Sequence, residues 1–132
     1  MAFTPGSLIS APAGADLHAS SHLIAKLDVN GKAVLAALPT DDIAGVLDMV
    51  PQGATGLCSI EHVSGTGTFE VIAGASIAKG AYLTVKNDSS GQAVTATQTA
   101  AGSQPSVRVF GRARVAANSG DQFEYERLFF LY

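Results

Sequence analysis

A stretch of 22 residues occurs twice in this chain and indicates how the chain is built. The first copy, Ala13 to Val34, reads AGADLHASSHLIAKLDVNGKAV, and the second, Ala73 to Val94, reads AGASIAKGAYLTVKNDSSGQAV. The copies align without a gap at an offset of 60 residues and share nine identical residues, where chance would give about two. Self-similarity at a fixed spacing predicts two similar units in tandem.

Each copy has the pattern of a β-hairpin. The segments HLIAKLDV and AYLTVKND alternate apolar and polar side chains, which is typical of a strand with one buried face. A turn follows in each copy, and the first turn contains Asn30 and Gly31. This dipeptide favours a type I′ turn, in which both central residues have positive φ. The return strands are KAVLAAL and QAVTATQT.

The similarity continues beyond the hairpins, after a six-residue insertion in the second copy. The segment TDDIAGVLDMV could form a helix, but its counterpart, PSVRVFGRARV, alternates and is rich in β-branched residues. We therefore expect strands in both. The two units span about residues 13–64 and 73–132. One unit alone would leave an open sheet edge and an unburied face. The expected fold is all-β, a compact β-barrel or β-sandwich made of both units.

Both ends of the chain are apolar. Residues 1–12 carry no charge and contain Pro5, Gly6 and Pro12, so we expect an extended N-terminal arm followed by a single β domain over residues 13–132. The chain ends in LFFLY, a run that is costly if exposed. It should form a central strand or contact another molecule.

Composition argues against several classes of function. The chain has 132 residues, a net charge of −3 and a pI near 5.4, and so it lacks the basic surface that nucleic-acid binding needs. No apolar run reaches the length of a membrane span. Cys58 is the single cysteine, which excludes a disulfide framework within the chain. The N-terminus does not resemble a secretory signal.

Candidate chemical groups are few. His18 and His22 are four residues apart, but no glutamate completes a zinc motif, and ordinary polar positions are the better interpretation. Glu124 and Glu126 should lie on one strand face about 7 Å apart, where a solvated face is far more common than a glycosidase pair. We expect no catalytic residues, no metal and no cofactor. An enzyme on a β-barrel remains a minor alternative.

Four arginines lie in the last quarter of the chain: Arg108, Arg112, Arg114 and Arg127. They could pair with carboxylates across a subunit interface, where arginine is enriched, or be ordinary surface charges. Both interpretations stay open.

The second unit resembles small phage head proteins of the capsid decoration, or cement, class. The shared pattern is a glycine-rich phrase, a turn, a short Ala/Thr-rich segment and a strand that ends in a hydrophobic residue, glycine, any residue and alanine. The matching residues are Gly74, Ile77, Gly80, Leu83, Gly91, Val94, Val109, Gly111 and Ala113. The first unit matches less well and has Ser20 where the second has Gly80.

The resemblance implies a structural protein that is made in the host bacterial cytoplasm and binds the outer surface of the mature head. Its partner would be the major capsid protein, and a homo-oligomer would be expected, with a trimer favoured. Multivalent binding by one rigid body would strengthen weak contacts. The residues that we expect at capsid or subunit contacts are Phe3, Leu8, Ile9, Arg112, Arg114, Phe129, Phe130 and Tyr132.

Two other functions compete with this one. A receptor- or carbohydrate-binding module of a phage tail or fibre would also be β-structured, but the chain has no Trp and three Tyr, whereas such modules usually present aromatic platforms. A self-assembling structural protein is the other alternative, and it would form open arrays where a decoration protein forms a small closed oligomer.

Overall fold

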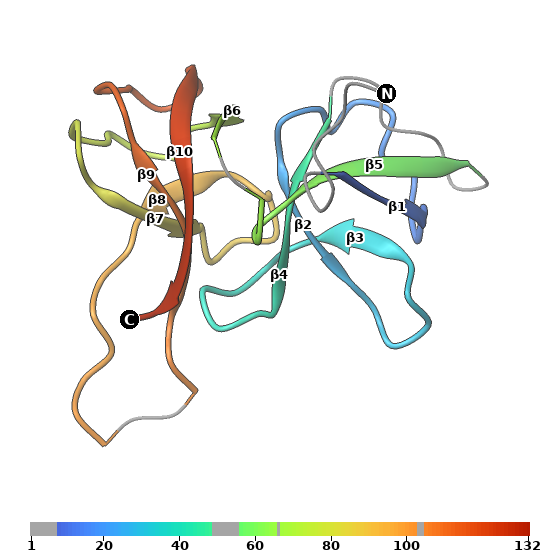
Figure 1. The fold of residues 1–132 in the computed structure, drawn as a ribbon, viewed down its shortest axis with the longest axis horizontal. Coiled ribbons are helices and arrows are strands. Elements are labelled where there is room, and N and C mark those ends of the chain that lie inside the picture. The colour runs from blue at the N-terminus through green and yellow to red at the C-terminus, as the bar shows by residue number, and fades with distance from the viewer. Residues whose placement is uncertain (1–7, 49–55, 66, 103–104) are drawn as a thin grey trace.

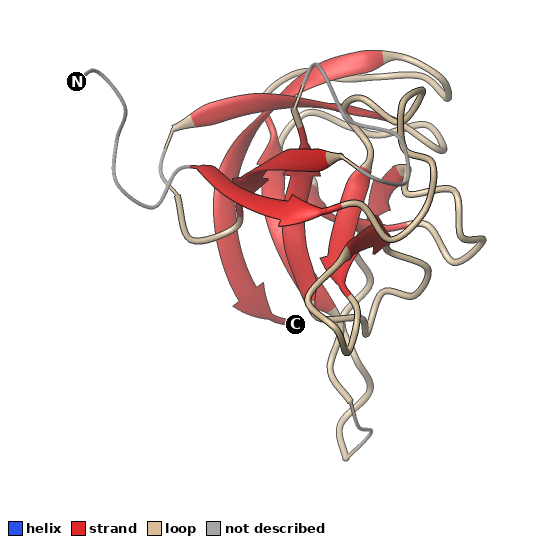
Figure 2. Cartoon of the chain, turned by 90° about the vertical axis from the view of Figure 1, so that its right-hand side faces the viewer, coloured by secondary structure: helices blue, strands red, loops and turns tan. Residues whose placement is uncertain are grey.

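The computed structural model describes residues 8–48, 56–65, 67–102 and 105–132. These residues form two five-stranded antiparallel sheets that pack together (Figure 1). None of them lies in a helix (Figure 2), and the described part of the chain therefore has no helix that could span a membrane. The expected all-β fold is confirmed, and its form is a β-sandwich.

Each sheet contains the strands of one half of the chain. In order across the first sheet, the strands are β1 (Leu8–Pro12), β5 (Leu57–His62), β4 (Ile43–Leu47), β2 (Ile24–Leu27) and β3 (Ala33–Leu35). Across the second sheet they are β6 (Thr68–Ile72), β10 (Gln122–Leu131), β9 (Arg108–Ala113), β7 (Tyr82–Val85) and β8 (Ala93–Thr95). The strand order is therefore the same in both sheets.

The register of the two sheets is also the same, which defines equivalent positions. Val46 pairs with Glu61 in the first sheet, as Arg112 pairs with Glu126 in the second. Gly45 lies opposite both Ala25 and His62, and Gly111 lies opposite both Leu83 and Arg127. Outside the strands, a parallel bridge joins Ala13 to Ala33, and another joins Ala73 to Ala93.

The register corrects the gap-free alignment of the two copies. Ala25 in β2 is equivalent to Leu83 in β7, an offset of 58 and not 60, whereas Ala33 and Ala93 keep the offset of 60. The second copy thus has two fewer residues before its first hairpin strand and two more in its turn. The expected insertion lies in the connection between β8 and β9, which extends away from the sheets (Figure 1).

The described residues form two apolar clusters, and the larger one joins the two sheets. The larger cluster lies between the sheets and joins Ile24, Ile43 and Val46 of the first sheet to the inner face of the second, including Phe110 and Tyr125. The smaller cluster covers the opposite face of the first sheet and consists mostly of small residues and aliphatic side chains: Ala11, Ala13, Leu17, Ala25, Ala33, Ala44, Leu47, Cys58 and Ile60. β4 is buried on both faces as a result.

The turn between β2 and β3 differs from the expected type I′ turn. Gly31 has a positive φ of 77°, but Asn30 does not. The Asp28 side chain accepts hydrogen bonds from the Asn30 and Lys32 amides, both at 2.9 Å, and the Gly31 amide donates to the Asp28 carbonyl. The longer connection needs a left-handed backbone at one residue only, and glycine supplies it.

The described part of the expected N-terminal arm belongs to the first sheet. Residues 8–12 form β1 and pair with β5, while residues 1–7 lie outside the described part. Ala11 is buried against the first sheet, and Leu8 is exposed. Residues 8–12 of the expected arm therefore form an edge strand of the first sheet.

Two truncations should separate the sheet strand from the residues that precede it. Removal of residues 1–7 should leave the free energy of unfolding within about 0.5 kcal/mol of wild type. Removal of residues 1–12 should lower it by about 2 kcal/mol or more, because the β1–β5 pairing and the buried Ala11 are lost. Urea unfolding of both truncated proteins measures the difference, and equal stability would contradict this role of β1.

Candidate functional site

The outer face of the second sheet, the face turned away from the first sheet, contains four of the eight predicted contact residues. Along β10, burial alternates: Phe123 and Tyr125 are buried, whereas Glu124 and Glu126 are exposed. The two carboxylates therefore share the outer face, as expected. Arg112, opposite Glu126, points the same way.

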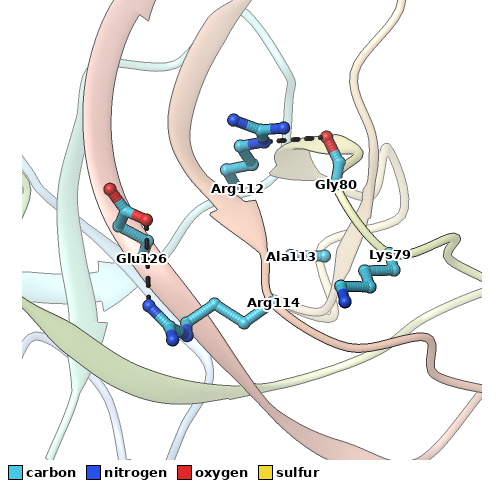
Figure 3. A pocket seen from close by; sticks show the side chains of 6 residues that line it. All are labelled: Lys79, Gly80, Arg112, Ala113, Arg114 and Glu126. Atoms are coloured by element: carbon cyan, nitrogen blue, oxygen red, sulfur yellow. Dashed lines mark hydrogen bonds and ion pairs between the residues drawn. The ribbon is translucent and has the colours of Figure 1, made fainter.

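A shallow pocket of about 260 Å³ lies on this face. It is lined by Lys79, Gly80, Arg112, Ala113, Arg114 and Glu126 (Figure 3). The Arg112 Nε donates a hydrogen bond to the Gly80 carbonyl at 3.2 Å. Arg114 pairs with Glu124 at 3.0 Å and lies 3.9 Å from Glu126. Three cations and one carboxylate line the pocket, so its charge suits an acidic partner surface.

Three aromatic side chains form a cluster beside the charged residues on the same sheet, where Tyr82 lies opposite Arg112. The rings of Tyr82, Phe130 and Tyr132 meet edge to face, with centroids 5.0 to 5.5 Å apart. All three side chains are partly exposed. The main chain of Tyr132 is fixed as well, because its amide donates to Val107 and its carbonyl accepts from Thr99. The C-terminal run thus presents rings in a defined geometry.

A second hollow, which we call the groove, has a volume of about 370 Å³ and lies mainly on the first sheet. Its lining residues are Leu27, Asp42, Ile43, Ala44, His62, Val63, Ser64 and Phe129. Leu27 and Phe129 are each 42% exposed at the groove. An exposed apolar surface of this kind marks an interaction site more often than a catalytic one.

The predicted contact residues separate into different regions. Arg112 and Arg114 share the charged pocket, and Phe130 and Tyr132 belong to the aromatic cluster. Phe129 lines the groove. Leu8 and Ile9 lie on the edge strand of the other sheet, with Ile9 packed against the smaller apolar cluster. Phe3 lies outside the described residues.

Sequence reasoning missed Tyr82 and Lys79, which complete the aromatic cluster and the charged pocket. Both come from β7 and the turn before it, far from β9 and β10 in sequence. The repeat could have indicated Tyr82, because it replaces a histidine in the alignment of the copies, but nothing local marks Lys79.

Arg127 is buried inside the molecule, whereas Arg112 and Arg114 are exposed and Arg108 is half-buried. It forms an ion pair with Glu61 of the first sheet at 2.9 Å, and the two side chains are 7% and 14% exposed. Burial raises the pKa of Glu61, the charge of Arg127 partly offsets this rise, and the Asp48 carboxylate adds to it. Arg127 therefore joins the two halves of one chain.

The two histidines of the first copy do not act together. His22 is buried with a positive φ of 63°, and its ring packs on Phe69 with centroids 5.2 Å apart. His18 is exposed and pairs with Asp16 at 2.7 Å. Among the described residues, no group of three or more His, Cys, Asp or Glu side chains could hold a metal ion.

Comparison with known proteins identifies a similar fold. The chain is similar to the base of the head fibre protein gp8.5 of bacteriophage phi29, with a TM-score of 0.60 and 24% sequence identity over 92% of both chains. No protein-family model matches the sequence, and neither does any curated protein. The likeness covers both sheets and shows the fold.

Proposed function

We propose that this protein is a structural, non-catalytic protein of a bacteriophage head, which attaches to the outside of the mature capsid. The observation that carries the proposal is the fold similarity to a head fibre base, which covers 92% of both chains. It is joined by the resemblance of most of residues 13–117 to capsid decoration proteins. In this proposal the partner is the major capsid protein, and the protein is located on the virion surface after synthesis in the host cytoplasm.

The surface chemistry supports a binding role. The outer face of the second sheet offers fixed arginines and ordered rings, and both groups are enriched in protein interfaces. Similar halves with the same strand order fit an origin by duplication, in which the common core builds the body. The parts that differ between the halves, including residues 1–7, the aromatic end and the β8–β9 connection, are then available for contacts.

Co-sedimentation tests the proposal directly. Purified protein is mixed with mature heads of its own phage that lack it, and we expect saturable binding at a fixed ratio to the major capsid protein. Removal of residues 1–7 should weaken this binding about tenfold or more while the fold persists, since these residues add apolar contact area. Absence of binding by the full chain would refute the proposed function.

The aromatic cluster favours one alternative, a module that binds host carbohydrate. Exposed rings can stack on sugar faces, and Tyr82, Phe130 and Tyr132 lie together. Binding of the protein to glycan arrays, lost on Tyr82→Ala, would support this alternative. Head binding that survives the same substitution would assign the cluster another role.

A further inference from the structure

The contact between the two halves joins different faces of equivalent sheets. The first sheet contributes the face that carries Ile24, Val46 and Glu61. The second sheet contributes its opposite face, which includes Phe110 and Arg127. A backbone hydrogen bond from the Ile24 amide to the Gly91 carbonyl, 2.7 Å long, lies at the same contact. Such a contact is heterologous and leaves one unmatched face at each end.

The unmatched face of the second sheet is its outer face. Tyr82 lies opposite Arg112 in the second sheet, as Ile24 lies opposite Val46 in the first. Tyr82 is therefore equivalent to Ile24, and Arg112 to Val46. Ile24 and Val46 are fully buried, whereas Tyr82 is partly exposed and Arg112 is exposed. Glu126 is equivalent to Glu61, and its side chain is 59% exposed.

The groove lies at the edge of the unmatched face of the first sheet. Leu27, Ala44 and His62 belong to that face, whereas Ile43 and Val63 belong to the cluster between the sheets and Phe129 comes from β10. Leu27 is equivalent to Val85, because each lies opposite the alanine that starts the return strand. Val85 is fully buried under the first sheet, but Leu27 is 42% exposed. His62, also in the groove, is equivalent to Arg127. At Leu27 and His62 the groove is therefore the open counterpart of the surface that receives the first sheet, while the rest of this face is covered by the smaller apolar cluster.

Side-chain sizes at the two open faces are complementary. On the outer face of the second sheet, Tyr82 and Arg112 are larger than the Ile and Val at the equivalent positions. At the groove, Ala44 takes the place of Phe110, since each precedes the paired glycine of its strand. Ala25, which is fully buried in the smaller cluster, takes the place of Leu83. Larger side chains on one surface thus match smaller ones on the other.

The charges are complementary as well. The pair Glu61–Arg127 within the chain corresponds to Glu126 on the outer face and His62 in the groove. Asp42, also exposed in the groove, can accept a hydrogen bond from an arginine such as Arg112. Size and charge therefore select the same occupant for the groove.

We infer that the groove binds the outer face of the second sheet of another copy of this chain, so that the contact between subunits repeats the contact between halves. Tyr82 and Arg112 of one copy enter the groove of the next beside Leu27 and Ala44, and Glu126 faces His62. The inference deepens the proposed function by specifying the oligomer contact. It does not depend on the capsid, because copies should associate without it. A head-to-tail contact closes into a ring when its rotation allows.

Sedimentation velocity of the purified chain tests the contact in the absence of heads. Leu27→Glu and Arg112→Glu should each weaken self-association about 100-fold, because each places a carboxylate at an apolar or acidic partner surface. Leu57→Glu is the matched control, since Leu57 is 65% exposed at the opposite end of β5. It should associate like wild type.

Ala44→Phe blocks the groove without a charge and should have the same effect as Leu27→Glu.

Mixing the two weakened variants distinguishes this contact from a symmetric one. Leu27→Glu retains its outer face and Arg112→Glu retains its groove, so an equimolar mixture should form a 1:1 dimer that does not grow. A monomeric wild type, wild-type association by either variant, or a mixture that stays monomeric would overturn the inference. Failure of head binding alone would refute the proposed function and leave this contact intact.

A further variant tests the charged pair. His62→Arg installs the residue that the second half has at this position, and it should tighten self-association about tenfold through Glu126. Glu126→Gln should remove this gain. An equal gain in the presence and absence of Glu126 would contradict the assigned pairing.

Discussion

Replacement of Gly45 by alanine is expected to lower the free energy of unfolding by about 3 kcal/mol. Gly45 lies in β4, at the centre of the first sheet. A Cβ atom there would overlap the carbonyl oxygen of Glu61 and lie 2.8 Å from its carbonyl carbon. Both atoms belong to the neighbouring backbone, so relief requires the β4–β5 pair to separate. Urea unfolding at a fixed protein concentration measures the loss.

Gly120→Ala is the matched control for this substitution. Gly120 has a positive φ of 90°, but an added Cβ would meet no atom within 4 Å. Gly120→Ala should lower the free energy of unfolding by about 1 kcal/mol, the cost of a left-handed backbone for a residue other than glycine. A loss at Gly45 no larger than the loss at Gly120 would show that β4 and β5 tolerate the extra methyl group, contrary to the close approach in the structure.

Arg127→Met is expected to destabilise the protein by about 3 kcal/mol at pH 7. The substitution keeps much of the apolar volume of the side chain but leaves the Glu61 carboxylate without its 2.9 Å partner between the two sheets. Glu61→Gln in the same chain removes the remaining charge and should recover most of the loss. Thermal unfolding of both single variants and the double variant completes the cycle. Purely additive effects would contradict the coupling.

The pH dependence of Arg127→Met has a defined sign. Burial already raises the pKa of Glu61, and loss of Arg127 removes the main charge that opposes this rise. In this variant the folded chain holds the proton more tightly than the unfolded chain. The variant should therefore be more stable near pH 5 than at pH 7, and stability should fall as pH rises through the folded pKa. The Arg127→Met/Glu61→Gln double variant, which lacks this carboxyl, should not show that dependence.

Much of the fold was predictable from local sequence patterns. Alternation in AYLTVKND and in the segment around Tyr125 located β7 and β10, because a half-buried strand repeats every two residues. The similarity between TDDIAGVLDMV and its counterpart correctly favoured a strand for β4. The turn type at Asn30 was wrong, because the Asp28 side chain stabilises a longer connection that the dipeptide alone does not reveal.

Less of the candidate site could be predicted from the sequence. Arg112 and Arg114 were identified as contact candidates, but Arg127 was grouped with them although it is buried against Glu61. Nothing in its neighbours distinguishes it, since its environment comes from the other half of the chain. Tyr82 was missed for the same reason, because its ring partners follow it by almost 50 residues.

By itself, the sequence determined the strands and their division into two similar groups, because residue alternation and glycine turns act over a few neighbouring residues. Only the tertiary structure decided the offset of 58 between β2 and β7, and which faces of the sheets meet. The reason is physical: a sheet has two faces, and both faces of β4 are apolar enough to be buried. Which face of the first sheet meets the second depends on packing between residues far apart in the chain, such as Val46 and Phe110, which belong to the same buried cluster.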